Sequence, residues 1–265
     1  MVHGGEIPWV GLGVFRVPTG ASGVNVVLEA LGQGYRHVDT ARIYGNEVEV
    51  GEAVRASGLP RGEVFVTSKV WNDDHGHDAT MRAVEGSLGR LDVGPIDLML
   101  VHWPVHGLRR ETWRALERCL GDGMVRAIGV SNYMVRHLEE MTAYANEKPA
   151  VNQIEVHPFL QQRDVRAWCR AQGVVVEAYS PLAKGRRMDH PVLGAVAAEV
   201  GRTPAQVLLR WGLERDMVVL PKSVSPERMA ENADLFGWEL GPVLLEHLDV
   251  LEEGSVTGWD PREAP

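Results

Sequence analysis

Short β-branched runs alternate with longer helical patterns along the whole chain, and this alternation constrains the fold more than any other feature. Several of the short runs are continuously apolar, as parallel strands covered on both faces usually are. Eight strands are predicted, at residues 10–15, 36–39, 63–68, 96–101, 125–130, 150–155, 174–178 and 217–220.

Helical patterns fill the intervals between these strands. Thr203 and Ser225 are predicted helix starts, because each places a capping hydroxyl directly before a proline that suits the first turn. Asp164 is interpreted as a third start, and three helices are expected to stop at Gly34, Gly58 and Gly173. The predicted helices are residues 23–32, 46–57, 78–91, 110–121, 134–145, 163–172, 191–200, 204–214, 226–233 and 242–252.

Eight strand-then-helix units in 265 residues predict an α/β fold of the (β/α)8 TIM-barrel type. We expect a single domain over residues 1–265, with extra helices near the C-terminus. The main alternative is a doubly wound open sheet, which binds dinucleotides through a glycine-rich fingerprint after its first strand. The stretch Gly11-Leu12-Gly13 is too short for that fingerprint and lacks its third glycine.

The composition argues against several classes of protein. A formal net charge of −9 and the lack of any Lys/Arg-rich run argue against a nucleic-acid binder. No apolar run approaches the roughly 18 residues of a membrane span, and the N-terminus lacks a signal-peptide core, so we expect a cytoplasmic protein without a membrane partner. The two cysteines, Cys119 and Cys169, exclude a disulfide scaffold and are expected to be reduced core thiols.

Four chemically different side chains end or follow successive predicted strands, namely Asp39, Tyr44, Lys69 and His102. Barrel enzymes build their sites at the carboxyl ends of the strands, so a closed barrel would bring these positions to one rim. Lysine is scarce in this sequence, where arginine supplies most of the 27 basic residues. Lys69 nevertheless ends an apolar strand, where an unpaired ammonium is costly.

This set of side chains fits carbonyl reduction, which needs a hydride source and a proton donor for the developing alkoxide. A tyrosine with a pKa near 10 holds its proton tightly, and a neighbouring ammonium lowers that pKa. Asp39 would keep Lys69 charged, and His102 would orient the carbonyl. Each residue taken alone has an ordinary explanation, such as a turn carboxylate or a satisfied core histidine. Their conjunction over successive strands indicates a site.

Three long motifs resemble the aldo-keto reductase superfamily, and the resemblance covers essentially the whole chain. They are GYRHVDTARIYGNEVEVG at residues 34–51, VRAIGVSNY at 125–133 and LPKSVSPERMAEN at 220–232. TSKVW at 67–71 and VHWP at 101–104 lie between them. The resemblance implies NADPH/NADP+ as cofactor and catalytic roles for the aspartate, tyrosine, lysine and histidine above. The overall pattern is similar to bacterial members that reduce diketo-sugar acids.

The resemblance also implies a cofactor in the barrel mouth, which accounts for the missing dinucleotide fingerprint. The implied contacts are Ser131, Asn132 and Gln153 at the nicotinamide carboxamide, Tyr179 stacked on its ring, Ser180 and Leu182 beneath the pyrophosphate, Lys222, Ser223 and Arg228 at the adenosine 2′-phosphate, and Glu231 and Asn232 at the adenine. The phosphate position also has independent physical support, since backbone N–H groups at a helix start favour an anion. Without the resemblance, a capped helix with solvated charges is the favoured explanation of this position.

Phe15, Trp71 and Trp103 lie at strand ends and are predicted to wall an apolar substrate pocket. Trp259, in the tail TGWDPREAP, either folds over the mouth or is disordered. The loops after the fourth and seventh strands are short, which predicts an open mouth. Basic residues in these loops would suit acidic or sugar-like substrates if they line that mouth, although solvated surface charge is the alternative; they are His106, Arg109, Arg110, Lys184, Arg186 and Arg187.

Two other classes of function stay open. One is an NADP(H)-binding sensor on the same barrel with little turnover. The other is a metal- or phosphate-dependent lyase or isomerase, for which His75 and His77, near Asp73 and Asp74, are the candidate ligands. Those two histidines are expected to be solvated loop residues, so no metal is predicted. The expected partner is a small-molecule carbonyl substrate, and the expected oligomeric state is a monomer.

Overall fold

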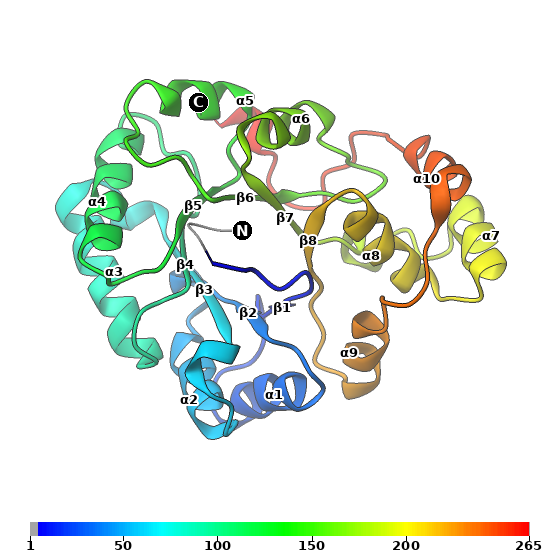
Figure 1. Ribbon diagram of the computed structural model, residues 1–265, viewed down its shortest axis with the longest axis horizontal. Helices are drawn as coiled ribbons and strands as arrows, with labels where there is room; N and C mark the ends of the chain where they lie inside the picture. The colour runs from blue at the N-terminus through cyan, green and yellow to red at the C-terminus, as the bar shows by residue number, and fades with distance from the viewer. Residues whose placement is uncertain (1–4, 265) are drawn as a thin grey trace.

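The computed structural model describes residues 5–264 and shows eight parallel strands in sequential order, enclosed by helices (Figure 1). The barrel closes where the Gly11 and Gly13 N–H groups donate to the Val219 and Pro221 carbonyls, each at 3.0 Å. The predicted (β/α)8 fold is confirmed. The strands are β1 (Leu12–Gly13), β2 (His37–Asp39), β3 (Phe65–Val70), β4 (Leu98–Val101), β5 (Ile128–Ser131), β6 (Val151–Glu155), β7 (Val175–Tyr179) and β8 (Met217–Leu220).

Strand β1 is shorter than the six residues that the sequence predicts. Its backbone bonds alternately to β8 and β2, since the Val14 N–H donates to the Asp39 carbonyl while Gly13 bonds toward β8. Regular pairing with β2 therefore covers only Leu12–Gly13. The remaining predicted strands agree with the structure to within about three residues at each end.

Helices follow the strands as predicted. They are α1 (Ala21–Gly32), α2 (Glu47–Ala56), α3 (His77–Leu91), α4 (Arg109–Gly121), α5 (Val135–Thr142), α6 (Arg163–Gln172), α7 (Pro191–Val200), α8 (Pro204–Glu214), α9 (Pro226–Ala233) and α10 (Gly241–Asp249). Short 3-10 turns lie at η1 (Arg42–Tyr44), η2 (Arg61–Glu63), η3 (Asn72–Asp74), η4 (Ala183–Gly185) and η5 (Pro261–Glu263). The two additional helices predicted near the C-terminus are α8 and α10, and α7 packs against both of them.

Two of the three predicted helix starts are confirmed. The Thr203 hydroxyl accepts from the Gln206 N–H, and the Ser225 hydroxyl accepts from the Arg228 N–H. The third helix has its predicted bounds, 163–172, but Asp164 is not its cap, because α6 begins at Arg163 after Gln162. Asp164 lies in the first turn, where its charge favours the positive end of the helix dipole but its side chain does not cap.

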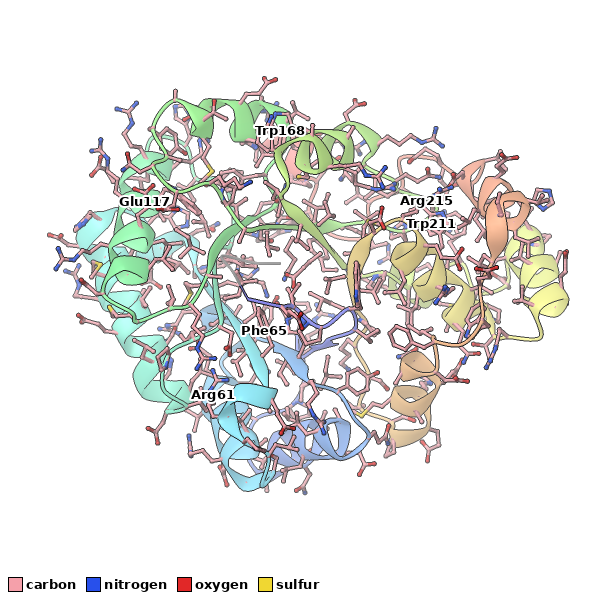
Figure 2. All side chains as sticks on the ribbon, viewed as in Figure 1. Arg61, Phe65, Glu117, Trp168, Trp211 and Arg215 are labelled. Atoms are coloured by element: carbon pink, nitrogen blue, oxygen red, sulfur yellow. The ribbon has the colours of Figure 1, made fainter. Side chains whose placement is uncertain are left out.

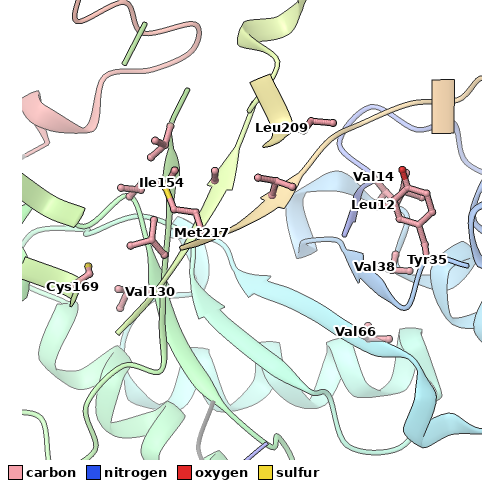
Figure 3. Close-up of a cluster of buried hydrophobic side chains, with 14 of the residues drawn as sticks. Leu12, Val14, Tyr35, Val38, Val66, Val130, Ile154, Cys169, Leu209 and Met217 are labelled. Atoms are coloured by element: carbon pink, nitrogen blue, oxygen red, sulfur yellow. The ribbon is translucent and has the colours of Figure 1, made fainter. Parts of the chain in front are cut away.

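Alternation along each strand separates two cores. Outward residues such as Val38, Val66, Val130 and Ile154 pack against the helices in a continuous buried cluster (Figure 3). Inward residues at the amino ends of the strands form a second apolar cluster, which includes Leu98, Leu100, Val151, Phe65 and Val175. Side chains fill the barrel, as Figure 2 shows. Apolar side chains therefore occupy the barrel interior near the amino ends of the strands.

Inward positions become polar toward the carboxyl ends of the strands. In β3 the inward series runs Phe65, Thr67, Lys69, and in β7 it runs Val175, Glu177, Tyr179. The same alternation that buries the apolar cluster thus aims the functional groups at one mouth.

Within residues 5–264, no helix is both long and apolar enough to cross a membrane. Cys119 and Cys169 are free thiols and are buried, as predicted.

Candidate active site

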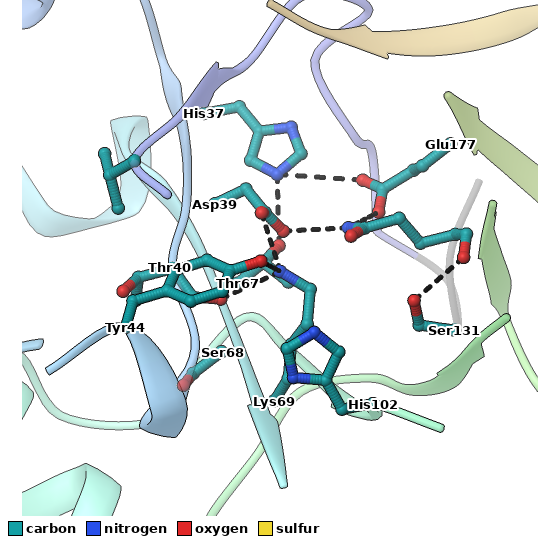
Figure 4. A network of polar contacts seen from close by, with 12 residues as sticks. His37, Asp39, Thr40, Tyr44, Thr67, Ser68, Lys69, His102, Ser131 and Glu177 are labelled. Carbon is teal, nitrogen blue, oxygen red and sulfur yellow. Dashed lines mark hydrogen bonds and ion pairs between the residues drawn. The ribbon is translucent and has the colours of Figure 1, made fainter. Parts of the chain in front are cut away.

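A buried ion pair lies at the centre of the barrel mouth. The Lys69 ammonium is 2.6 Å from Asp39 Oδ1 and donates a second bond to the Thr40 carbonyl at 3.0 Å (Figure 4). Asp39 is the last residue of β2, and Lys69 lies inside β3 rather than after it. Lys69 is completely buried, so its charge depends on these oxygen partners.

A tight loop after β2 presents Tyr44 to this pair. The loop turns through η1 and ends at Gly45, whose φ of 70° suits glycine. Asn46 anchors the loop, since its amide donates to the Val14 carbonyl at 2.9 Å and its oxygen accepts from the Thr40 hydroxyl at 2.7 Å. The polar residues that follow the tyrosine therefore fix its position.

Glu47 is the second anchor of the tyrosine loop. Its carboxylate accepts from the Ser68 hydroxyl at 2.5 Å and pairs with Arg90 at 2.7 Å, although the glutamate itself is buried. Ser68 is the outward neighbour of Lys69 on β3. The loop and the strand that carries the ammonium are thus tied together from behind.

The Tyr44 hydroxyl lies 3.5 Å from Lys69 Nζ. Burial raises the pKa of Tyr44, and the Lys69 charge opposes that rise without cancelling it. The expected lowering by the ammonium is therefore outweighed, and the phenol holds its proton. Burial opposes the Lys69 ammonium, but Asp39 and Tyr44 outweigh it, so the pKa of Lys69 lies above its ordinary value.

His102 follows β4 and faces Tyr44, with ring centroids 5.8 Å apart and nearly perpendicular rings. Burial, and next the Lys69 charge, hold the pKa of His102 well below its usual range, so the imidazole is neutral. Trp71 lies 5.1 Å from the His102 ring, and Phe15 lies 5.0 Å from the Tyr44 ring. The structure thus brings two of the predicted pocket walls against the polar pair.

The residues predicted for the nicotinamide end also lie together. The Asn132 amide donates to the His102 carbonyl at 3.0 Å, and its oxygen accepts from the Tyr179 hydroxyl at 2.8 Å. The Ser131 hydroxyl donates to the Gln153 backbone carbonyl at 2.9 Å. Asn132 has a φ of 64°, which asparagine tolerates better than most residues. These side chains are held in place before any ligand arrives.

Gln153 makes an unexpected pair of contacts. Its amide nitrogen donates to Asp39 Oδ2 at 2.8 Å and to Glu177 Oε2 at 2.9 Å, and these two bonds use both of its N–H groups. Its side-chain oxygen is then the group that can accept from a carboxamide NH2. A nicotinamide carboxamide needs an acceptor for its NH2 group, and the Gln153 oxygen supplies one. The residues present therefore fit such a cofactor.

The predicted phosphate residues lie apart from this centre, at the start of α9. Lys222 and Arg228 are exposed, and neither forms an ion pair with the part of the chain that the structure describes. The Ser223 hydroxyl accepts from the Ser225 N–H at 3.1 Å and so shapes the turn before the helix. Two unpaired cations beside a helix N-terminus fit a dianionic phosphate.

The other residues predicted along the cofactor differ in their surroundings. Glu231 accepts from the Thr203 hydroxyl at 2.5 Å, so it is already engaged with the start of α8. Asn232 is buried, while Ser180 and Leu182 are half-buried in the loop after β7. Ser180 has a φ of 47°, which marks a sharp turn at the end of that strand.

The C-terminal tail is ordered and lies over the mouth. Glu155, at the end of β6, accepts from the Thr257 N–H at 2.9 Å and from its hydroxyl at 2.5 Å. Lys184 donates to the Thr257 carbonyl at 2.9 Å. Trp259 then lies 5.8 Å from the Trp103 ring while remaining 69% exposed. Trp259 therefore adds an aromatic wall beside a predicted one.

Two expectations about the loops were wrong. Arg109 does not line a basic rim, because it is buried and pairs with Glu140 at 2.6 Å. Lys184 holds the tail, as described above, and Arg187 pairs with Glu253. His75 is not solvated, since it is only 6% exposed. Burial lowers the pKa of His75 to about 4, and neither ring nitrogen has a hydrogen-bond partner within residues 5–264.

The molecule also has a hollow away from the predicted site. A cavity of about 1320 Å³ lies at the other end of the barrel, beside the amino ends of strands at Phe65, Val175 and Met217. None of the predicted site residues lines it. Within residues 5–264, no group of three or more histidine, cysteine or carboxylate side chains is placed to hold a metal ion.

Sequence reasoning missed His37, Asn46, Glu47 and Glu177. The first and last are ionisable groups inside otherwise apolar strands, which is the signal that singled out Lys69. Asn46 and Glu47 stand in the motif around Tyr44, but nothing in their spacing separates an anchor from a solvated turn.

Comparison with known proteins gives one consistent result. The sequence model described as "Aldo/keto reductase family" matches residues 11–250. Glyoxal reductase of Bacillus subtilis (strain 168) is 46% identical over 261 residues, covering 98% of this chain and 95% of the relative. Morphine 6-dehydrogenase of Pseudomonas putida is 42% identical, with 98% and 93% covered. A solved variant of Gox0644 in complex with NADPH is 41% identical, with a TM-score of 0.92 and 98% and 95% covered.

Proposed function

Because the chain belongs to the aldo/keto reductase family, we propose that it reduces aldehydes and ketones to alcohols with NADPH, with Tyr44 as the proton donor. The observation that carries the proposal is the partly buried contact of Tyr44 with Lys69, beside Asp39 and a neutral His102. Similarity to a glyoxal reductase and to a protein crystallised with NADPH supports it.

Each residue of this group has a separate task in the proposal. Tyr44 keeps its proton until a carbonyl oxygen gains charge, because burial disfavours phenolate. The Lys69 ammonium then stabilises the phenolate that remains. A neutral His102 donates a hydrogen bond to the same carbonyl oxygen without introducing a second full charge. In the reverse direction, phenolate accepts the proton of an alcohol.

Bound NADPH would supply the hydride. Asn132, Ser131 and Gln153 would hold its carboxamide, and Tyr179 would stack on the ring. Ser180 and Leu182 would line the pyrophosphate path. At the far end, Lys222, Ser223 and Arg228 would hold the 2′-phosphate, with Asn232 and Glu231 near the adenine. The unpaired cations at α9 support NADPH over NADH, since an unmodified ribose offers them no charge.

The substrate pocket is proposed to be a shallow aromatic slot. Phe15 and Trp71 flank the Tyr44–His102 pair, and Trp103 continues this wall toward Trp259. Small carbonyls of the glyoxal type, and flat aromatic aldehydes, suit such walls. Arg109, Lys184 and Arg187 are committed to the protein itself, which leaves only His106, Arg110 and Arg186 to favour sugar-acid substrates. All of these groups come from one barrel, so the proposal needs only a monomer.

Tyr44→Phe tests the proposal. Wild type and variant would be compared for NADPH oxidation with methylglyoxal, nitrobenzaldehyde, glyceraldehyde and a diketo acid. We expect kcat to fall about 10²- to 10⁴-fold in the variant while NADPH affinity is retained. Tight NADPH binding without turnover of any carbonyl by the wild type would overturn it and favour an NADP(H)-binding sensor.

A further inference from the structure

A second carboxyl group lies beneath the catalytic ion pair, and the family's tetrad does not include it. Glu177 lies on β7, directly opposite Gln153 of β6 in the strand register, and both point into the barrel. Glu177 is completely buried. Its Oε2 accepts from the Gln153 amide at 2.9 Å, and its Oε1 lies 3.7 Å from His37 Nε2 (Figure 4).

The Gln153 amide links this carboxyl to Asp39. One amide nitrogen donates to Glu177 at 2.9 Å and to Asp39 at 2.8 Å, and Asp39 in turn holds Lys69 at 2.6 Å. A continuous polar chain thus runs from Glu177 to the ammonium beside Tyr44. Because Asp39 Oδ2 and Glu177 Oε2 both accept from the Gln153 amide nitrogen, the two contacts together favour one of its two flipped orientations.

The groups facing Glu177 determine its charge. β2 contributes Asp39 and His37, and β3 contributes Lys69. β6 contributes the neutral Gln153, and the register partner on β8 is Val218. Burial first, and Asp39 second, raise the pKa of Glu177 to about 8. Burial lowers the pKa of His37 to about 4, so this histidine is neutral and offers no compensating charge.

We propose that Glu177 is a positioning residue of this reductase, which fixes the orientation of the Gln153 amide and, by its ionisation, adjusts the proton affinity of Tyr44 through Lys69. In the neutral form, Glu177 leaves Asp39 and Lys69 as a balanced pair. In the ionised form, it adds a negative charge that disfavours phenolate at Tyr44. This inference rests on the proposed function, since it concerns the same site.

Glu177→Gln separates the two effects. Glutamine keeps an oxygen that accepts from the Gln153 amide but cannot ionise. We expect NADPH affinity to stay within about threefold of wild type. The descending alkaline limb of kcat/KM for carbonyl reduction should move down by about one pH unit, as expected for a unit charge removed from a site of moderate dielectric.

Glu177→Leu removes the acceptor as well, so Asp39 alone holds the Gln153 amide and its orientation is fixed by one contact instead of two. We expect this variant to lose affinity for NADPH about tenfold, measured by quenching of tryptophan fluorescence. Asp97→Asn is the matched control, because it removes another buried carboxyl that contacts neither Gln153 nor Lys69 and lies away from the mouth. The control should leave the alkaline limb in its wild-type position.

An infrared measurement decides the charge of Glu177 without turnover. The wild-type protein at pH 7 should show a protonated-carboxyl band that disappears on ionisation above pH 8 and is missing in Glu177→Gln. If the wild type reduces no carbonyl, the proposed function is wrong. The infrared band still tests the charge of Glu177 in that case, because it is measured without turnover. An unshifted alkaline limb, or no band assignable to Glu177, would overturn the inference.

Discussion

The Lys69 ammonium is 2.6 Å from Asp39 Oδ1, and both groups are buried in the barrel mouth. The desolvation of two charges is expensive, so such a pair adds little stability compared with apolar residues of equal volume. Breaking it by removing one partner is different, because the other charge is left without compensation. The pair is thus better explained by its effect on the neighbouring Tyr44 phenol than by a contribution to stability.

Asp39→Asn should therefore affect both stability and catalysis. We expect the free energy of unfolding in urea to fall by about 3–5 kcal/mol, since the Lys69 ammonium loses its carboxylate partner and keeps neutral ones such as the Thr40 carbonyl and the Tyr44 hydroxyl. Carbonyl reduction per folded molecule should fall as well. Asp97→Asn is the matched control, because Asp97 is buried and pairs with Arg61 and Arg126 away from the mouth. It should destabilise the fold without lowering kcat; equal kcat in both variants would contradict the assignment of Asp39.

Buried neutral histidines make stability depend on pH. The folded-state pKa of His75 is about 4, below its ordinary value of 6.5, so its contribution is complete above pH 6.5 and is lost as the pH falls toward 4. Between pH 6.5 and 5 this one group should cost about 2 kcal/mol of unfolding free energy. His75→Gln should remove that part of the acid loss. His77→Gln should not, because the His77 side chain is 45% exposed; an identical acid loss in all three proteins would contradict this prediction.

The cations beside α9 should discriminate between the two nicotinamide cofactors. Arg228→Ala is expected to raise KM for NADPH about 10- to 100-fold, the usual effect of losing one charge-assisted bond. KM for NADH should change little, because NADH lacks the 2′-phosphate. Lys148→Met removes an exposed cation whose ammonium donates to the Gln172 carbonyl, and it serves as the control. Parallel losses with both cofactors would place the phosphate elsewhere.

Trp259 should act on aromatic substrates alone. Trp259→Ala removes the ring that lies 5.8 Å from Trp103, and an aromatic pair of this kind contributes about 0.5–1.5 kcal/mol. We expect KM for nitrobenzaldehyde to rise roughly 2- to 12-fold. KM for methylglyoxal should stay the same, since that substrate is too small to reach the tail. Equal changes for both substrates would mean that the tail acts on the whole site.

Much of the fold could be predicted from the sequence, because apolar residues recur with helical spacing in the helices and form short continuous runs in the strands. Lys69 was found by the cost of a charge in an apolar strand, and the same rule applied to His37 and Glu177 finds the lower polar layer as well. The burial of His75 could not be predicted, since its loop has no periodicity and its cover comes from elements distant in sequence. The raised pKa of Tyr44 is likewise a tertiary effect, because it depends on how completely the loop is covered.

The closing bonds from Gly11 and Gly13 to Val219 and Pro221 have a consequence for the timing of activity during synthesis. Asp39, Tyr44, Lys69 and His102 all leave the ribosome in the first half of the chain, yet Gln153 and Glu177 arrive later and β8 arrives near the end. Until β8 joins β1, the ion pair stays open to water and the phenol lacks its covered environment. We therefore expect a nascent chain that already carries all four proposed catalytic side chains to stay inactive until β8 joins β1.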